Sequence, residues 1–195
     1  NITDDVESEN KMLDQERRYK HFFNSDSIGW VEVSAPNLIR SVVEANYDFK
    51  KVIEEHREDI GLVTRFNQRA GDIFGLSKGM NPADFEPLRY INEGIEDLAA
   101  KFFGAIKNKL DSFTCEVVIK NNYGEMRNLN INVHFADVGG KGDLLYGIQD
   151  ITDLKESVKA LRESEERYRT MFDSNSLAVV YTNYQKDMVK INESF

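Results

Sequence analysis

The residues of this sequence that could do chemistry are few and scattered. Its three histidines (His21, His56 and His134) and its single cysteine, Cys115, are the side chains best suited to binding a metal or attacking a substrate. Metal sites draw on such residues at short, regular spacings, and these four follow no such spacing. We therefore expect no metal site. We interpret the histidines as surface or interface residues and Cys115 as a small core or edge residue of a strand.

Four acidic residues, Asp72, Asp84, Glu86 and Asp97, are the candidates for general acid–base catalysis. Such catalysis requires a carboxyl group within hydrogen-bond reach of the reacting group. The sequence places none of the four against a nucleophile. We expect no catalytic residue and no enzyme activity in this chain.

The chain contains an internal repeat. Residues 1–4 (NITD) recur as residues 150–153 (DITD), 149 positions later, and the alignment continues without a gap as far as Phe23 and Phe172. In the strands that follow, the offset falls to 125 positions, which indicates an insertion of 24 residues in the first copy. A fixed period is typical of an array of modules. The repeated stretch is therefore expected to be the joint between two modules.

Each joint is predicted to begin a helix. In the second copy, Asp153 is followed three positions later by Glu156, a pair that can cap the first helical turn. Spacings of four and three then place apolar side chains along one seam, the pattern of helices that pair with a partner helix. We expect a homodimer through the linker helices. The dimer seam consists of Leu154, Val158, Leu161, Tyr168 and Phe172.

The composition argues against two classes of binding partner. The formal net charge of −9 argues against nucleic acid or an anionic membrane surface, because both bind clustered Lys and Arg. A single cysteine fits a reducing compartment, and no apolar run reaches the roughly 18 residues of a membrane span. We expect a cytoplasmic location, no nucleic-acid partner and no direct membrane contact of this fragment, with a membrane anchor elsewhere in the parent protein left open.

Periodicity predicts an α+β domain. In residues 127–135, Leu129 and Ile131 alternate with polar residues, as expected for a sheet with one buried and one polar face. Asp48 is a candidate helix N-cap and Gly75 a candidate helix end. The predicted strands span 28–33, 61–66, 115–120, 127–135 and 144–149, and the predicted helices lie within 37–60, 67–75 and 88–110.

This order of elements, together with three sequence motifs, resembles the PAS (sensory-box) family. Residues 47–67 are also similar to the insertion of a PAS subtype that carries extra helices between the first two strands. Asn121 stands where the PAS hairpin usually has Asp. The motifs are FNQRAGDIFG (66–75), like the asparagine-led segment after the second PAS strand; KNNYGEMRNLNINV (120–133), like the hairpin between the third and fourth strands; and ESEERYRTMFDSNSLAVV (163–180), like the approach to a first strand.

The resemblance implies an α+β PAS fold, a five-stranded antiparallel sheet with helices on one face, flanked by N- and C-terminal linker helices. It also implies a division of the chain into four parts. These are the end of a preceding PAS domain and a linker helix (1–18), a complete PAS domain with a helical insertion at about 37–60 (19–153), a linker helix (154–170), and the truncated start of a following PAS domain (171–195).

The function that the resemblance implies is that of a sensory or relay module in a multi-PAS signalling protein, such as a sensor histidine kinase or a diguanylate cyclase. Adjacent PAS domains and an output domain would be its partners. The signal would leave through the helix after the DITD motif, and the alternative is a ligand-free structural spacer and dimerisation module. The implied relay residues are Asp150, Ile151, Thr152, Asp153 and Glu156.

PAS domains sense through a pocket between the helices and the inner face of the sheet. We predict no cofactor, because residues 88–110 lack a histidine for haem and Cys115 lies outside the position used by flavin photoreceptors. An unknown small-molecule ligand is the alternative to a plain apolar core. The candidate lining residues are Val63, Phe74, Phe85, Leu98, Phe102, Ile106, Val117, Ile119, Ile131, Val133 and Leu145.

Overall fold

The computed structural model describes residues 27–136, 142–173, 180–182 and 188–191. The chain divides after Ile151 into two units. The described part of the first unit is an α+β domain, and that of the second holds helix α6 (Thr152–Asp173) and the strands β7 (Val180–Thr182) and β8 (Met188–Ile191). The first joint, residues 1–23 with His21, lies outside the described residues.

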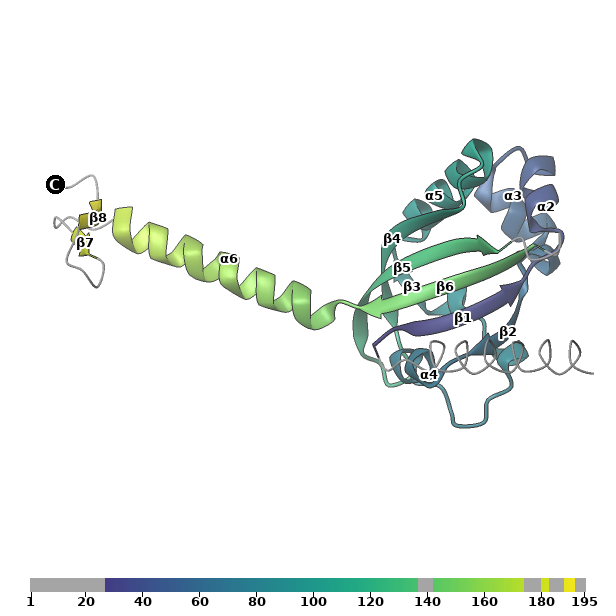
Figure 1. Cartoon of the computed structure of the whole chain (residues 1–195), viewed down its shortest axis with the longest axis horizontal. Coiled ribbons are helices and arrows are strands. Elements are labelled where there is room, and N and C mark those ends of the chain that lie inside the picture. Colours follow the sequence, from purple (N-terminus) through teal and green to yellow (C-terminus); the bar gives the residue numbers. More distant parts are fainter. Residues whose placement is uncertain (1–26, 137–141, 174–179, 183–187, 192–195) are drawn as a thin grey trace, which may run out of the picture. The chain divides into compact units, whose positions relative to one another are not determined.

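The first unit is built on one antiparallel sheet with the strand order β2-β1-β6-β5-β4-β3 (Figure 1). The predicted number of five strands is wrong, because a short strand, β3, pairs with the outer edge of β4. The other five strands confirm the prediction. The bounds are β1 Gly29–Ser34, β2 Leu62–Phe66, β3 Ile91–Glu93, β4 Ser112–Lys120, β5 Met126–Ala136 and β6 Asp143–Asp150.

The long helix predicted over residues 88–110 is also wrong in its first half. Helix α5 spans Ile95–Asn108, after the short 3-10 helix η3 (Pro87–Tyr90) and β3. Gly94 separates them with φ +91°, and a Cβ at this position would lie 2.9 Å from the carbonyl oxygen of Glu116. Only glycine fits this conformation without strain. The chain therefore turns at Gly94, and the residues before it extend along β4 instead of joining the helix.

The helices predicted between the first two strands are present. They form α2, α3 and a short 3-10 helix, η1, before β2 begins. Asp48 caps α3 as predicted, because its Oδ1 accepts the backbone N–H groups of Lys50 at 2.9 Å and Lys51 at 3.2 Å. The remaining helical segments are α2 Leu38–Glu44, α3 Phe49–Glu55, η1 Arg57–Ile60, α4 Gln68–Phe74 and η2 Pro82–Asp84.

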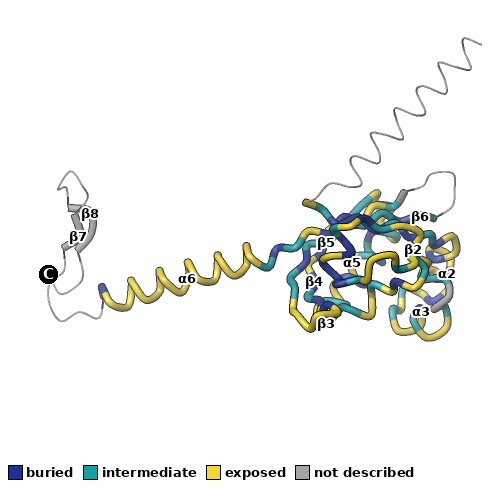
Figure 2. Tube along the Cα trace, turned by 90° about the horizontal axis from the view of Figure 1, so that it is seen from below, coloured by how far each residue is buried: buried dark blue, intermediate teal, exposed yellow. Residues whose placement is uncertain are grey.

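The two faces of the sheet differ as the alternation in β5 predicted. Leu129, Ile131 and Val133 are buried on the inner face of β5. His134 lies on the opposite face and is exposed. The buried residues of the sheet form one core cluster with residues of α2, α3, α4 and α5. Helix α6, in contrast, is exposed along nearly its whole length (Figure 2).

The β7–β8 hairpin repeats the register of the β1–β2 hairpin. The repeat offsets of 149 and 125 positions convert the three pairs of β7–β8 into three of the four pairs of β1–β2, and both ladders shift register after their second pair. From the sequence, the tail is expected to pair with a sheet edge of another module or another chain, or to be poorly ordered. In the structure β7 and β8 pair with each other, and the expectation about an additional partner stays a prediction. The equivalent pairs are Val31–Phe66 and Val180–Ile191, Glu32–Arg65 and Tyr181–Lys190, and Val33–Val63 and Thr182–Met188.

Asn67 joins α4 to β1. Its Oδ1 accepts the backbone N–H groups of Trp30 and Ala70, each at 2.9 Å, and its Nδ2 donates to the carbonyl oxygen of Ile28 at 2.9 Å. The side chain is buried. One amide therefore caps α4 and fixes the start of β1 at the same time.

We expect Asn67→Ala to lower the free energy of unfolding by about 2–3 kcal/mol, because it removes a helix cap and leaves buried backbone groups without partners. Asn81→Ala is the control, since Asn81 caps the short η2 with a single 3.3 Å bond to the N–H of Ala83 at the surface. Its cost should be below about 1 kcal/mol. Urea unfolding measures both, and equal losses would contradict the role given to Asn67.

Candidate functional site

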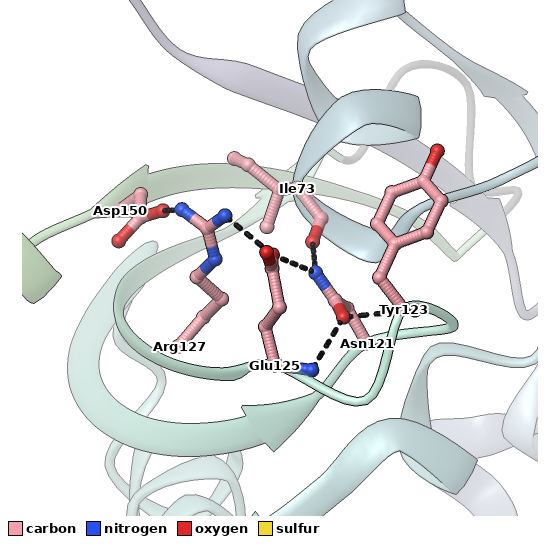
Figure 3. Close-up of polar contacts among 6 residues, drawn as sticks. All are labelled: Ile73, Asn121, Tyr123, Glu125, Arg127 and Asp150. Carbon is pink, nitrogen blue, oxygen red and sulfur yellow. Dashed lines mark hydrogen bonds and ion pairs between the residues drawn. The ribbon is translucent and has the colours of Figure 1, made fainter.

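The end of β6 is tied to β5 by an ion pair at the place where the predicted relay motif begins (Figure 3). Arg127 Nη1 lies 3.0 Å from Asp150 Oδ2, and Arg127 Nη2 lies 2.6 Å from Glu125 Oε2. Because β5 and β6 are antiparallel, the start of one strand lies beside the end of the other. The side chain of Asp150 is only 11% exposed. Arg127 therefore bridges the β4–β5 hairpin to the last residue of the sheet.

The hairpin itself is closed by a buried asparagine. Asn121 Oδ1 accepts the backbone N–H groups of Tyr123 at 3.0 Å and Glu125 at 2.9 Å. Its Nδ2 donates to Glu125 Oε2 at 3.0 Å and to the carbonyl oxygen of Ile73, in α4, at 3.5 Å. An aspartate, usual in the PAS hairpin, could accept the first two bonds but could not donate the others. The amide thus connects the turn to α4.

The same hairpin covers the C-terminus of α4. Asn122 donates its backbone N–H to the carbonyl oxygen of Phe74 and its Nδ2 to that of Gly75, both at 3.1 Å. Gly75 ends the helix with φ +68°, and a Cβ there would lie 2.9 Å from the ring of Tyr123. The last carbonyl groups of a helix lack partners within it. Here the hairpin supplies them, so α4 and the hairpin are expected to move together.

Hydrogen bonds within the network favour the ionised forms of Glu125 and Arg127. The hydrogen bond from Arg127 lowers the pKa of Glu125, with a second contribution from Asn121, and the bond to Glu125 raises the pKa of Arg127. The backbone next to Asp150 is fixed as well, because the N–H of Ile151 donates to the carbonyl oxygen of Asn128 at 2.8 Å. A continuous set of contacts therefore runs from α4 through the hairpin to the last two residues of the first unit.

The predicted relay residues fall in two places. Asp150 belongs to this network, and Ile151 is buried beside it. Thr152 begins α6, so the predicted N-cap role of Asp153 is wrong: Asp153 lies inside the first turn. Its carboxylate still faces the positive end of the helix dipole. Glu156 is exposed on α6 and lies beyond the first turn.

Sequence reasoning missed the three residues that build the network: Asn121, Glu125 and Arg127. Asn121 had been noted only as a departure from the usual aspartate of the hairpin. A signal was present, because opposite charges at the start of one antiparallel strand and the end of its neighbour can meet across the ladder. Using that signal requires the strand register, which the structure supplies.

Most of the predicted pocket residues lie in the core. Phe102 and Ile106 are half-buried against it, and Leu145 is wrongly assigned. Leu145 pairs with Glu32 and His134, on the outer face, while its neighbours in β6 alternate inward. Because Leu144 and Leu145 are adjacent and equally apolar, the sequence alone does not show which of them faces the core. The predicted residues that are buried are Val63, Phe74, Phe85, Leu98, Val117, Ile119, Ile131 and Val133.

Aromatic rings fill the space between the helices and the inner face of the sheet. In one group, the ring of Phe85 lies 5.0 Å from that of Phe74 and 5.6 Å from that of Phe66. In the other, the ring of Phe102 lies 5.4 Å from that of Phe135 and 5.9 Å from that of Phe113. Edge-to-face and tilted rings at these distances pack favourably. The inner face is therefore an aromatic core.

Ionisable groups in this core are held neutral. Burial raises the pKa of Cys115 to about 11, so its thiol is protonated at neutral pH and is a poor nucleophile. Burial also raises the pKa of Tyr146. Among the described residues, no group of three His, Cys, Asp or Glu side chains is placed to hold a metal ion, and no helix is long and apolar enough to cross a membrane.

The predicted dimer seam on α6 is largely exposed within the single chain. Leu154, Val158 and Leu161 are each more than half exposed, whereas the rings of Tyr168 and Phe172 stack with centroids 5.9 Å apart. Charged side chains lie beside the seam and form ion pairs along the helix. These pairs are Lys159–Glu163 at 4.0 Å and Arg162–Glu166 at 3.0 Å.

No protein-family model matches the chain, and no curated protein sequence matches it. Among solved structures, the PAS domain of an HTR-like protein from Haloarcula marismortui is 12% identical, with a TM-score of 0.47, over 75% of this chain and 99% of its own. A domain of a sensory box sensor histidine kinase/response regulator from Geobacter sulfurreducens is 14% identical, with a TM-score of 0.47, over 71% and 96%. A sensory box histidine kinase/response regulator from Burkholderia thailandensis is 16% identical, with a TM-score of 0.47, over 78% and 98%.

The Arg127 network should make stability depend on pH. Because the folded-state pKa of Glu125 is lowered, its contribution is present above the unfolded value of about 4.3 and is lost as pH falls through the folded value. We expect the free energy of unfolding to decrease between about pH 5 and pH 3, and to decrease less in Arg127→Gln.

Urea unfolding at pH 7, 5, 4 and 3 measures this dependence. Arg65→Gln is the matched control, since Arg65 lies 3.9 Å from Glu32 on the outer face and does not touch the network. The control should keep the wild-type contribution of Glu125. The same pH dependence in Arg127→Gln as in both other proteins would contradict the assignment.

Proposed function

We propose that this chain is a sensory or relay PAS module of a multidomain signal-transduction protein. In this proposal a change in the inner core moves α4, and the movement reaches α6 through the β4–β5 hairpin and Asp150. One observation carries the proposal: the unbroken contacts from the carbonyl oxygen of Ile73 through Asn121, Glu125 and Arg127 to Asp150. The sequence motifs of the sensory-box family support it independently.

The mechanism requires two arrangements of this network. A stimulus can shift an equilibrium only if it favours one state over the other. Phe74, at the end of α4, packs against Phe85 in the core, while its carbonyl oxygen accepts a bond from the hairpin. A change in ring packing would therefore change the position of the hairpin, and Arg127 would transmit that change to the residue pair that precedes α6.

The output in this proposal is the pairing of two α6 helices from two copies of the chain. The exposed apolar seam needs a partner to be buried, and a second copy offers an identical seam. The charges beside the seam are of both signs and pair along the helix, so they do not set two identical helices against each other. A shift in the start of α6 would alter how the two helices pack, and adjacent PAS and output domains would read that shift.

A ligand-free spacer and dimerisation module is the second candidate. The observation that favours it is the aromatic packing of the inner face, where Phe102 contacts Phe113 and Phe135. In the spacer, the signal would arise in a neighbouring domain and pass through the same network. Mass spectrometry of small molecules released when the purified protein is denatured separates the two candidates, because only the sensor would release a stoichiometric ligand.

Hydrogen exchange tests the relay. In Arg127→Gln, we expect the amides of Ile151 and of the second turn of α6 to exchange faster, by about fivefold if the Arg127–Asp150 pair contributes about 1 kcal/mol. Amides at the centre of β5 should not change. Arg65→Gln should leave α6 as it is in the wild-type chain. Unchanged exchange at the start of α6 in Arg127→Gln would refute the proposed path.

The dimer seam can be tested with two variants, each of which adds one charge at one of two adjacent positions. Leu161→Asp places a carboxylate in the seam, and Ala160→Asp places one on the neighbouring face of the same helix. We expect Leu161→Asp to weaken the dimer at least tenfold, because a charge cannot be buried there without a partner. Sedimentation velocity over a concentration series measures the effect, and equal behaviour of the two variants would exclude the seam as the interface.

A further inference from the structure

The outer face of β1 and β6 is shielded from solvent around Trp30, although the helices α2 to α5 contribute to the core on the inner face of the sheet. We propose that this outer face is the docking surface for the end of the first joint, residues 17–23. A joint that arrives from a preceding module would then rest directly on the sheet. The inference does not depend on the proposed relay through the β4–β5 hairpin, which uses other residues.

A row of four residues across the sheet shows how far the shielding extends. Trp30, Gly147, Asn132 and Thr114 pair in turn across β1, β6, β5 and β4. Trp30 is 8% exposed and Gly147 is buried, whereas Asn132 is half-buried and Thr114 is exposed. A Cβ on Gly147 would lie 3.1 Å from a ring carbon of Trp30, so the indole lies over β6. The shielding is therefore centred on Trp30 and ends between β5 and β4.

The indole of Trp30 has one side against β6, and its low exposure requires cover on the other side as well. Helix α6 is exposed along nearly its whole length, so it does not provide this cover. The β5–β6 connection joins β6 at Asp143, four positions before Gly147 and thus roughly 13 Å away along the strand. The residues before β1 instead join the sheet at Gly29, next to Trp30. They are the best-placed segment of the chain to cover the indole.

The end of the first joint is tethered close to this surface. Phe23, which lies outside the described residues, is separated from Gly29 by five residues, 24–28. Five residues span at most about 17 Å when fully extended. Such a short tether gives the joint a high effective concentration at the start of β1. A small contact area is therefore sufficient for docking.

The second copy of the repeat indicates which residue of the joint is buried. Phe172, which aligns with Phe23 at the offset of 149 positions, is 5% exposed. Its neighbour Met171, which aligns with Phe22, is 72% exposed. Because β1 and β2 repeat as β7 and β8, the two joints precede equivalent strands. We therefore expect Phe23 to be buried where the first joint meets the sheet, and Phe22 to be exposed.

The surface and the joint carry opposite charges. Glu32 lies on the outer face of β1, and burial raises the pKa of its carboxyl group; Asp143 nearby raises this pKa further, whereas Arg65 lowers it. Two carboxylates beside one guanidinium leave this part of the face negative. Residues 17–20 (RRYK) supply three cationic side chains. Docking of the joint would therefore place cations beside the acidic end of the surface.

Asn132 adds a hydrogen-bond acceptor to the surface. Its Oδ1 is buried and accepts no hydrogen bond from the described residues. Buried polar atoms in folded proteins normally have a partner. Residues 17–21 (RRYKH) all have side chains that can donate a hydrogen bond. A joint docked over β6 would bring such donors to the edge of the shielded area, where Asn132 lies.

Fluorescence of Trp30 tests the proposal in the full chain, because this residue is the only tryptophan in the sequence. In Phe23→Asp, we expect acrylamide to quench Trp30 roughly threefold more strongly, because a carboxylate cannot be buried beside the indole without a partner and the joint would leave the surface. The emission maximum should move to longer wavelength. Phe22→Asp is the matched control, since the equivalent Met171 is exposed, and should be quenched like the wild-type chain. Circular dichroism checks that the sheet is intact in both variants.

Unchanged quenching in Phe23→Asp, or an equal increase in Phe22→Asp, would overturn the proposal. So would wild-type quenching that weakens as the protein concentration rises, because a second copy of the chain would then be the cover. If Phe23→Asp does not fold, Phe23→Ala replaces it, with Phe22→Ala as the control. Removal of the ring should then increase the quenching of Trp30 in Phe23→Ala alone, and equal quenching of the two alanine variants would refute the docking.

Discussion

The structure around the candidate site depends on one buried amide, that of Asn121. A buried polar group must find hydrogen-bond partners or destabilise the fold. Asn121 finds four: two backbone N–H groups of its own hairpin, the carboxylate of Glu125 and the carbonyl oxygen of Ile73. Meeting this requirement sets the shape of the turn and holds it against the end of α4.

The consequences extend to the end of the sheet. Once Asn121 orients Glu125, the carboxylate of Glu125 lies within 2.6 Å of Arg127, and Arg127 in turn lies 3.0 Å from Asp150. Asn121 and Glu125 lie in the β4–β5 turn, Arg127 lies in β5 and Asp150 ends β6. The polar contacts therefore follow the strand pairing, and a segment far from α6 in the sequence is placed beside the residues that precede it.

Comparison of the two copies of the repeat divides the domain into a constant part and an added part. The constant part is the sheet with α4, α5 and the hairpin network. The added part is the segment from residue 35 to residue 61, which adds Leu38, Val42, Ala45 and Val52 to the core cluster and places Tyr47 and Phe49 against Phe103.

Local signals in the sequence determined a large part of this protein. The repeat, five of the strands, the cap at Asp48 and the helix end at Gly75 all depend on residues close together in the chain, so their physical causes are visible there. Tertiary structure alone decided three features. Gly94 breaks the periodic segment because a carbonyl oxygen of β4 lies against it. Leu145 faces outward because pairing with two neighbouring strands places Leu144 inside. Arg127 meets Asp150 because the register of β5 and β6 brings them together, and register is a property of the folded sheet that no single segment contains.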